Sequence, residues 1–327
     1  MQPPVLWLHT LGAAFFWGTS NFLYSNLDTQ GEFAVTCLSW TGFVGTAIGY
    51  KAYKICTDTR GVNGDVIRDV MFKDIVNRKN LAHQAFRTAN WFLYIWLTII
   101  IGDYAKRAAI NPGIIYACLS STIIFNTFFA AWFFKEKLSL KISVGIAVVI
   151  GGVVWITIAK NADKPVSIVE EGHLMTFSPE EIFHNRLMGI LIAILTALLS
   201  SMRPVQAKIV KLKYNYHPFD FTVDSGLVTG GLLFPFWLYY LLGGHPAYTL
   251  MNAIYSLFAS TILMFWGLLG LYASVNGPQG PTSAIMQVHA IFSIAMAAIF
   301  QGYIPNIQQS LASLTILVGV ILIIFYK

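Results

Sequence analysis

The sequence is poor in charged residues. Asp, Glu, Lys and Arg together make up 11% of the 327 residues, whereas a soluble globular domain has about 25%. Hydrophobic residues make up 56%, and the mean hydropathy is +0.63. This composition excludes a soluble globular enzyme, a disordered chain and a nucleic-acid-binding module, and it indicates an integral membrane protein.

Cysteine is scarce, and the common catalytic motifs are missing. The three cysteines, Cys37, Cys56 and Cys118, form no C-x-x-C pair and no Cys/His cluster, so neither a disulfide framework nor a metal site is predicted. The sequence also contains no G-x-x-x-x-G-K-[ST], H-E-x-x-H or G-x-S-x-G motif. We therefore expect a protein that is not an enzyme, uses no cofactor and is not driven by ATP.

Apolar stretches of spanning length fill most of the chain. A bilayer-spanning helix needs about 20 apolar residues, and no stretch alternates apolar and polar residues as a barrel strand would. The ten stretches are approximately 5–25, 32–53, 89–109, 112–134, 139–159, 187–207, 219–242, 252–274, 281–303 and 306–326. The predicted fold is an all-α polytopic membrane protein with ten transmembrane helices.

Two connections between these stretches are long. Within 54–88, apolar residues recur at helical spacing over 66–76, which predicts either an amphipathic helix on the membrane surface or a solvated loop. The second connection, 161–185, is an acidic linker between an N-terminal part, 1–160, and a C-terminal part, 186–327. Near its end, Ser178-Pro179-Glu180-Glu181 has the spacing of a capping box, so a helix is expected to begin at Ser178.

The distribution of cations predicts the orientation. Ten spans place both termini on one side. Sixteen of the 21 Lys and Arg residues fall on that side, in 51–88, 135–141 and 203–213 and at Lys327, while five fall on the other. Because Lys and Arg accumulate on the inner side of a membrane, both termini are predicted on the inside or matrix face. A plasma membrane, a secretory-pathway membrane and a mitochondrial inner membrane fit this pattern equally.

The two halves of the chain resemble each other over 104–152 and 272–319. The matching features are Tyr104-Ala105 with Tyr272-Ala273, Asn111-Pro112-Gly113 with the Asn276–Gly280 stretch, and Gly152 with Gly319. Because each half has an odd number of spans, the second half inserts upside down, which predicts a 5+5 inverted repeat. Small residues at 145, 151 and 152 also predict close helix packing in span five.

Several motifs in the first half carry a family resemblance. They are Trp17-Gly18-Thr19-Ser20-Asn21-Phe22, Tyr104-Ala105 before Asn111-Pro112-Gly113, and Phe134-Lys135-Glu136-Lys137-Leu138-Ser139 followed by Gly145, Gly151 and Gly152. With these motifs the sequence resembles the drug/metabolite transporter superfamily, EamA-type. The resemblance implies ten helices arranged as five plus five and a secondary transport activity.

Polar and aromatic residues inside the spans form the candidate binding site, because polar groups are costly in a bilayer. The predicted substrate-binding residues are Trp17, Asn21, Ser121, Asn126, Trp266, Gln287 and His289. The alternative role of the polar ones is an interhelical hydrogen bond. Other aromatic residues lie near span ends or along spans, and most of them are expected at the membrane interface or facing lipid. This set includes Trp91, Tyr94, Trp96, Trp237, Tyr239 and Tyr240.

Two residues are candidates for coupling transport to an ion. His289 titrates near neutral pH and is the first candidate for proton coupling. Asp103 is the acidic alternative, although an ion pair with Lys106 or Arg107, three and four residues on, is expected there instead. Asp220 and Asp224 are expected to meet Lys211, Lys213 or water.

Two functions follow from these features. The first is a secondary transporter of a small polar or amphipathic solute by alternating access. A phosphorylated solute is disfavoured because spans eight to ten contain no Lys or Arg before Lys327. The second is a transporter-derived structural subunit of a larger membrane complex, since Gly302-Tyr303-Ile304-Pro305 stands where the acidic turn should recur. Expected partners are the solute, membrane lipids, and either a second copy or complex subunits.

Overall fold

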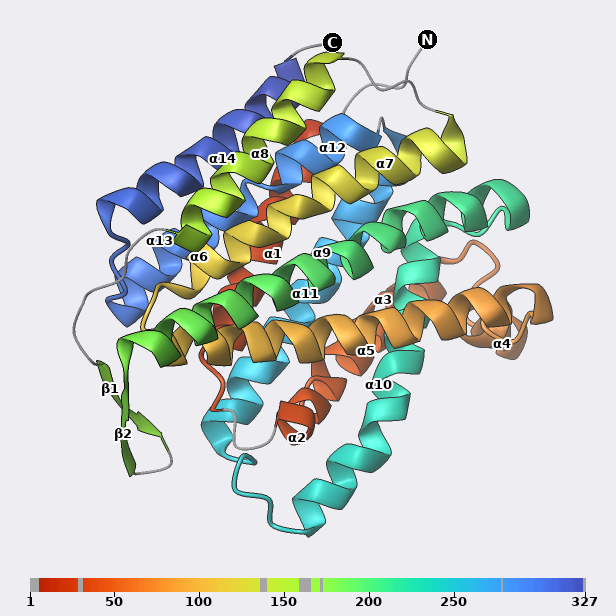
Figure 1. Cartoon of the computed structure of the whole chain (residues 1–327). Helices are drawn as coiled ribbons and strands as arrows, with labels where there is room; N and C mark the ends of the chain where they lie inside the picture. The colour runs from red at the N-terminus through yellow and green to blue at the C-terminus, as the bar shows by residue number, and fades with distance from the viewer. Residues whose placement is uncertain are drawn as a thin grey trace.

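A computed structural model describes residues 6–28, 32–135, 140–158, 166–170, 173–277 and 279–325. These residues form a bundle of long helices that cross one another, with one small hairpin at its edge (Figure 1). In chain order the elements are α1 (Trp7–Ser25), α2 (Glu32–Cys37), α3 (Trp40–Thr57), α4 (Gly64–Phe72), α5 (Arg78–Arg107), α6 (Pro112–Ala117), the 3₁₀ helix η1 (Cys118–Ser121), α7 (Thr122–Phe134), α8 (Leu140–Ile158), β1 (Val166–Glu170), β2 (His173–Phe177), α9 (Pro179–Tyr214), α10 (Pro218–Leu242), α11 (Leu250–Asn276), α12 (Gln279–Met286), α13 (His289–Gln301) and α14 (Ile307–Phe325).

The architecture is that of a helical membrane protein. Each of the ten apolar stretches coincides with one helix or with consecutive short helices. Within the described residues, six helical segments are long and apolar enough to cross a membrane. The boundaries of two helices were predicted too short, because α5 has 30 residues and α9 has 36. The polar residues 78–88 of α5 and 208–214 of α9 extend beyond the apolar stretches and were therefore not recognised as helix.

Besides the interruption between α2 and α3 at Leu38 and Ser39 in the stretch 32–53, two stretches predicted as continuous helices are broken. The stretch 112–134 consists of α6, η1 and α7, and the stretch 281–303 contains the boundary between α12 and α13 at Gln287 and Val288. Neither break contains Gly or Pro, so the local sequence carries no signal for it. A 3₁₀ segment inside a helix often marks a functional hinge, and here both breaks lie at the bundle centre.

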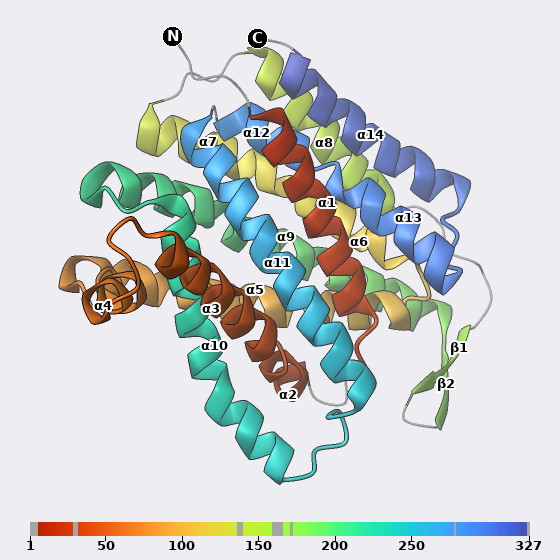
Figure 2. The same cartoon turned by 180° about the vertical axis from the view of Figure 1, so that it is seen from behind.

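The two halves of the chain interleave in one core. Helix α1 packs along α11, α5 along α9, α3 along α10, and α8 along α14 (Figures 1 and 2). The main hydrophobic cluster accordingly joins Ala13 and Tyr94 from the first half with Ile190 and Trp266 from the second. In each of these four helix pairs, one partner comes from each half.

The close approach of α8 and α14 depends on glycine. A Cβ atom added at Gly152 would lie 2.6 Å from Ile316 Cγ1, and one added at Gly319 would lie 2.8 Å from the carbonyl oxygen of Gly145. The packing role predicted for Gly145 and Gly152 is confirmed. Gly151 has open space in the direction of its missing Cβ, so that glycine does not take part in the contact.

The two long connections contain regular structure. Helix α4 begins after Asn63, whose side chain accepts a hydrogen bond from the Val66 amide at 2.9 Å, so a helix rather than a loop occupies part of 66–76. Helix α9 begins after Ser178 with a complete capping box, as predicted. The antiparallel pair β1–β2 lies within the acidic linker and was not predicted; residues 161–165 and 171–172 of the linker are outside the described part.

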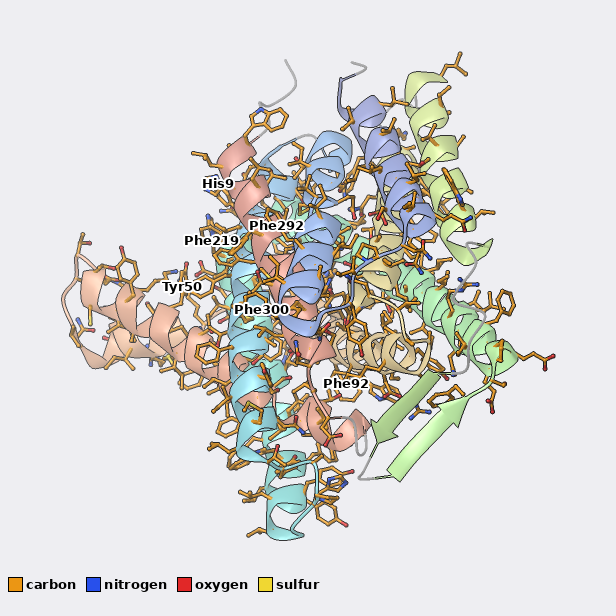
Figure 3. All side chains as sticks on the ribbon, turned by 90° about the vertical axis from the view of Figure 1, so that its left-hand side faces the viewer. His9, Tyr50, Phe92, Phe219, Phe292 and Phe300 are labelled. Atoms are coloured by element: carbon orange, nitrogen blue, oxygen red, sulfur yellow. The ribbon has the colours of Figure 1, made fainter. Side chains whose placement is uncertain are left out.

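The segments assigned to the inner face share one end of the bundle. The start of α1, the end of α14, α4 and the ends of α7 and α9 lie toward the top and right of Figure 1, whereas β1–β2 and the α10–α11 connection lie at the opposite end. Near the first end, His9 of α1 and Phe219 of α10 lie close together (Figure 3). Their ring centroids are 5.3 and 4.8 Å from the ring centroid of Tyr272 in α11, respectively. These ring contacts hold α1, α10 and α11 together.

Candidate functional site

Four buried rings from four helices stack at the centre of the bundle. The Trp17 ring of α1 lies 3.8 Å from the His289 ring of α13 and 5.0 Å from the Trp266 ring of α11, measured between centroids. The Tyr94 ring of α5 stacks on the Trp266 ring, with the two centroids 5.7 Å apart. Three of these four residues, Trp17, Trp266 and His289, were predicted from the sequence as site residues, and the structure brings them together.

Hydrogen bonds connect this stack to the polar residues of neighbouring helices. The Trp17 indole N–H donates to the Tyr94 hydroxyl at 2.5 Å, and that hydroxyl donates to Asn21 Oδ1 at 3.3 Å. On the other side, Asn126 Nδ2 donates to Ser283 Oγ at 2.8 Å, which joins α7 to α12. His289 Nδ1 lies 3.1 Å from the carbonyl oxygen of Met286, next to the break between α12 and α13.

A cavity of about 20 Å³ remains between these side chains. It has room for roughly one water molecule, so packed side chains close the centre. Predicted residues Trp17, Asn126, Trp266 and Gln287 line it, together with Arg203 and Ser274 among others. Ser121 is buried in η1 but is not among the lining residues; its neighbour Thr122 is.

The small cavity is bordered by polar atoms that lack hydrogen-bond partners within the described part of the chain. They are Asn126 Oδ1, Gln287 Oε1, Ser274 Oγ, Trp266 Nε1 and Arg203 Nη1. A buried polar group without a partner costs about 1–3 kcal/mol. Several such groups around one cavity therefore favour the binding of a polar ligand or a water molecule there.

Arg203 is the central cation of the site, and its role was not recognised from the sequence. Its side chain is 1% exposed, and its guanidinium carbon lies 4.2 Å from the ring centroids of both Trp91 and Tyr94 and 5.2 Å from that of Trp266. Its Nε donates to Asn90 Oδ1 at 2.5 Å. Both Trp91 and Tyr94 are fully buried and lie against the guanidinium, so the expectation that they face lipid or the interface was wrong.

Arg87 is a second buried cation beside the first. Its side chain is 0% exposed, and its guanidinium carbon lies 5.6 Å from the Trp91 ring and 5.7 Å from the Phe221 ring. None of its three side-chain nitrogens has a hydrogen-bond partner among the residues that the structure describes. The cation distribution predicts both arginines at the inner surface, and this prediction was wrong. Arg87 belongs to α5, which begins 11 residues before the predicted span. Arg203 lies close to the predicted end of span six.

Asp103 lies apart from this site. Its carboxylate pairs with Arg107 at 3.0 Å on the same helix, which confirms the expected ion pair. Lys106, the other candidate partner, donates to the carbonyl oxygen of Leu27 at 2.6 Å. Asp103 therefore forms an ion pair in the last turns of α5 and does not take part in the central site.

A charged hollow of about 430 Å³ lies between α3, α4 and α10. Four ion pairs line it, and the two that join α3 to α10 are Lys51–Asp224 at 2.5 Å and Lys54–Asp220 at 2.8 Å. The lysines of α3 thus replace the Lys211 and Lys213 expected as partners, because α10 packs along α3. Lys51 Nζ also donates to the carbonyl oxygen of Val70 in α4 at 2.7 Å.

A hydrogen-bonded chain leads from this hollow to α5. The Tyr216 hydroxyl donates to Asp224, and Gln84 Nε2 donates to Tyr216 Oη at 3.0 Å. Gln84 precedes Arg87 by three residues on the helix, so the two side chains are neighbours along one face. At the rim of the hollow, hydrogen bonds from Arg60 lower the pKa values of Asp58 and Asp69.

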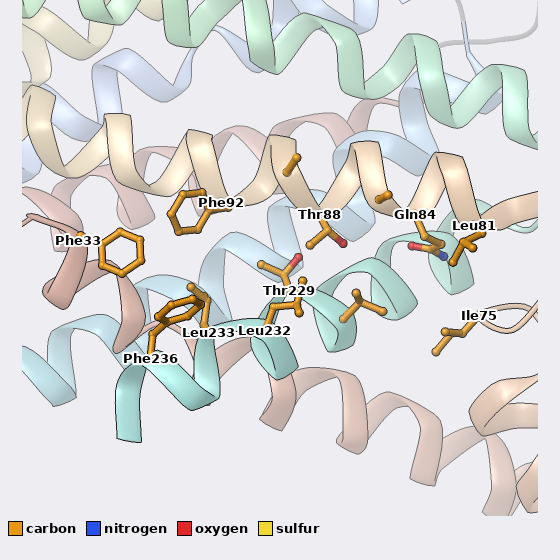
Figure 4. A pocket seen from close by; sticks show the side chains of 13 residues that line it. Phe33, Ile75, Leu81, Gln84, Thr88, Phe92, Thr229, Leu232, Leu233 and Phe236 are labelled. Atoms are coloured by element: carbon orange, nitrogen blue, oxygen red, sulfur yellow. The ribbon is translucent and has the colours of Figure 1, made fainter. Parts of the chain in front are cut away.

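A third hollow, of about 530 Å³, is a groove between α5 and α10 (Figure 4). Its lining is apolar except for Gln84, Thr88 and Thr229, and Phe33, Phe92 and Phe236 form one end. Such a lining suits hydrocarbon rather than a polar solute. None of the residues predicted to bind solute lies in it.

No protein-family model matches the sequence, and no curated protein matches it. Among solved structures, 26 chains match. One of them, described only as "Crystal structure of protein", aligns with a TM-score of 0.60 over 96% of this chain and 94% of its own, at 15% sequence identity. At that identity the likeness concerns the fold, which the two chains share over nearly their whole lengths.

Proposed function

We propose that this chain is a secondary transporter that moves a small polar or amphipathic, non-phosphorylated solute by alternating access, in the manner of the EamA-type transporters it resembles. The observation that carries the proposal is the pair of broken helices. The breaks at Cys118–Ser121 and at Gln287–Val288 lie about 168 positions apart, the same offset as the sequence repeat. Broken helices in corresponding positions of two halves point to a binding site at the membrane midplane.

The packing of helices supports a 5+5 inverted repeat with ten spans. The repeat relates span one (α1) to span six (α9) and span three (α5) to span eight (α11). The α1–α11 pair therefore corresponds to the α9–α5 pair, and both pairs pack closely. The repeat also relates α3 to α10 and α8 to α14, and in each case the two related helices pack against each other. The α1–α13 contact corresponds in the same way to the α9–α7 contact. A pseudo-two-fold axis through the bundle would account for all of these pairs.

Transport requires the centre to open. The cavity of about 20 Å³ corresponds to an occluded state, from which the two halves rock to expose the site to either side. Pro204 within α9 and Pro235 within α10 supply bends, because each removes one backbone hydrogen bond from its helix. His289, stacked on Trp17, is the proposed site of proton coupling, since Asp103 is engaged by Arg107.

Uptake by proteoliposomes tests the proposal. Vesicles containing the purified protein are exposed to a defined mixture of amino acids, organic acids and neutral metabolites, and the lumen is analysed by mass spectrometry. We expect at least one solute to accumulate, and the accumulation to disappear in Asn126→Ala and His289→Ala. His184→Ala, which removes an exposed histidine on α9, is the matched control. Normal uptake by both central variants would remove these residues from the mechanism.

The closed centre favours a second candidate, a structural subunit of a larger membrane complex. A protein that has lost its transport activity needs no solute-sized cavity, and a cavity with room for one water molecule fits such a protein. Purification of the native protein in mild detergent distinguishes the two. Stable stoichiometric partners together with absent uptake favour the structural role, whereas a monomer or homodimer that accumulates solute favours transport.

A further inference from the structure

The groove between α5 and α10 is open to the outside of the bundle. Its volume of about 530 Å³ lies within the range of about 300–1,000 Å³ that is typical of ligand pockets. Among its lining residues, Leu81, Leu232 and Phe236 are 60%, 58% and 50% exposed. Both helices are long and apolar enough to cross a membrane, so this groove faces the bilayer. Water does not fill an apolar recess, and hydrocarbon is therefore its natural content.

Two short side chains of α5 create the space. Ala85 and Ala89 both line the groove and are exposed, and a spacing of four residues places them on one face of the helix. The larger side chains of Leu81 and Phe92 line the groove before and after them. A large side chain at either alanine would fill the space between α5 and α10.

The groove runs from one surface of the bilayer toward its middle. Helix α5 has 30 residues and is therefore about 45 Å long, which equals the thickness of a bilayer with its headgroups. Its first residue, Arg78, thus lies at the level of the headgroups, and Phe92, 14 residues on, lies about 21 Å deeper. Figure 4 shows Leu81 and Ile75 at one end of the groove and Phe92 toward the other. This is the course of one acyl chain.

A cation stands on the groove side of α5 at the shallow end. Arg78 precedes Leu81 by three residues and Ala85 by seven, so it lies on the same helix face as these lining residues. Lys79 follows it, and both side chains are exposed. Lys and Arg clusters next to the end of a transmembrane helix attract anionic lipid headgroups. Among the described residues that line the groove itself, none is charged.

We propose that the groove between α5 and α10 binds one acyl chain of an anionic membrane phospholipid, whose phosphate lies beside Arg78 and Lys79. The hydrocarbon fills the groove but does not select the lipid, because all bilayer chains are as apolar as the leucines here. Selection comes from the cations, since a guanidinium fork matches two phosphate oxygens. The site is independent of the transport activity proposed above and holds for a structural subunit as well.

Native mass spectrometry of the purified, delipidated full chain tests the site. The probes are dioleoyl phosphatidylglycerol and dioleoyl phosphatidylcholine, which differ in headgroup charge and share their chains. We expect one phosphatidylglycerol to bind tightly to each chain, and phosphatidylcholine to bind more weakly. Ala89→Phe should abolish this binding because the ring occupies the groove. Arg78→Gln should weaken phosphatidylglycerol binding by about fivefold, which is the effect of one cation near the membrane surface.

Matched variants control for a general effect of each change. Ala295→Phe alters an exposed alanine of α13 that does not line the groove, and Lys135→Gln removes an exposed cation at the end of α7. Both should bind phosphatidylglycerol as the wild type does. If Ala89→Phe does not fold, as judged by circular dichroism, the smaller change Ala85→Leu should weaken binding in the same direction.

Three results would overturn the proposal. The first is equal binding of phosphatidylglycerol by the wild type and the groove-filling variants. The second is equal affinity of the wild type for the two lipids, or an affinity for phosphatidylglycerol that Arg78→Gln leaves unchanged. The third is a dimer of the delipidated wild type that Ala89→Phe dissociates, which would show that a second copy of the chain covers the groove.

Discussion

The indole N–H of Trp17 donates a 2.5 Å hydrogen bond to the hydroxyl of Tyr94, across 77 residues of sequence and between α1 and α5. The same hydroxyl bonds to Asn21, and the Trp17 ring stacks on His289. One tyrosine hydroxyl therefore fixes the orientation of the ring that faces the proposed coupling residue.

Replacing Tyr94 by Phe should destabilise the protein without changing its fold. The substitution leaves Trp17 Nε1 and Asn21 Oδ1 buried without partners, at an expected cost of about 1–3 kcal/mol. The midpoint of thermal unfolding in detergent measures the effect. Tyr239→Phe, at a tyrosine that is 73% exposed, is the control and should unfold as the wild type does; equal midpoints for the two variants would show that the hydroxyl network contributes nothing.

Neighbouring glycines of α8 should respond in opposite ways to alanine. At Gly152 a Cβ would lie 2.6 Å from Ile316 Cγ1 and 3.0 Å from the Ile316 amide nitrogen, whereas at Gly151 it meets open space. Gly152→Ala should therefore separate α8 from α14 and lower the Tm. Gly151→Ala should be neutral or stabilising by up to about 1 kcal/mol, because alanine is the better helix former. Equal effects of the two changes would contradict the packing.

The buried pair Lys51–Asp224 should be far more sensitive than the pair Lys54–Asp220. The side chains of the first pair are 5% and 4% exposed, against 39% and 22% in the second. Lys51→Met leaves the Asp224 carboxylate buried without its cation and should cost about 3 kcal/mol or more. Lys54→Met should cost less than about 1 kcal/mol.

A double variant checks that the lost partner, rather than lost packing, causes this cost. Lys51→Met combined with Asp224→Leu removes both charges and should recover most of the stability in a thermal unfolding series. A double variant as unstable as the sum of the single variants would show that the two residues act independently.

The first turn of α9 should loosen in acid. Hydrogen bonding of the Glu181 carboxylate to the Ser178 backbone amide lowers the pKa of Glu181 below its ordinary value. Stability from a carboxylate of this kind is present above its unfolded pKa and is lost as the pH falls through the folded pKa. Amide hydrogen-exchange protection of residues 179–183 should therefore decrease below about pH 4, the ordinary range of a glutamate.

Two variants separate the parts of this cap. Glu181→Gln should make the exchange protection independent of acid, and Ser178→Ala should weaken the first turn by about 1 kcal/mol at neutral pH. Glu180→Gln, which alters a residue outside the capping box, is the control. Unchanged protection in Ser178→Ala would contradict a role for the cap in starting the helix.

The sequence by itself determined the features that depend on local composition. Apolar stretches marked the positions of the helices, because burial in lipid requires only length and hydropathy. The start of α9 at Ser178 and the pair Asp103–Arg107 also followed from spacing along one helix. Of the predicted site residues, Trp17, Asn126, Trp266 and Gln287 meet at one cavity, since intramembrane polar and aromatic positions tend to face the bundle interior.

Only the tertiary structure decided which helices meet, and the remaining features depend on that. The breaks in the α6–α7 and α12–α13 stretches carry no Gly or Pro signal, and Asp224 pairs with Lys51, 173 residues away, because α10 packs along α3. Arg87 and Arg203, which the cation distribution assigned to the inner face, are buried because α5 packs along α9, and both guanidiniums lie near the Trp91 ring. Hydropathy records how much of a helix is apolar, whereas the partner of each buried charge is set by contacts between distant segments.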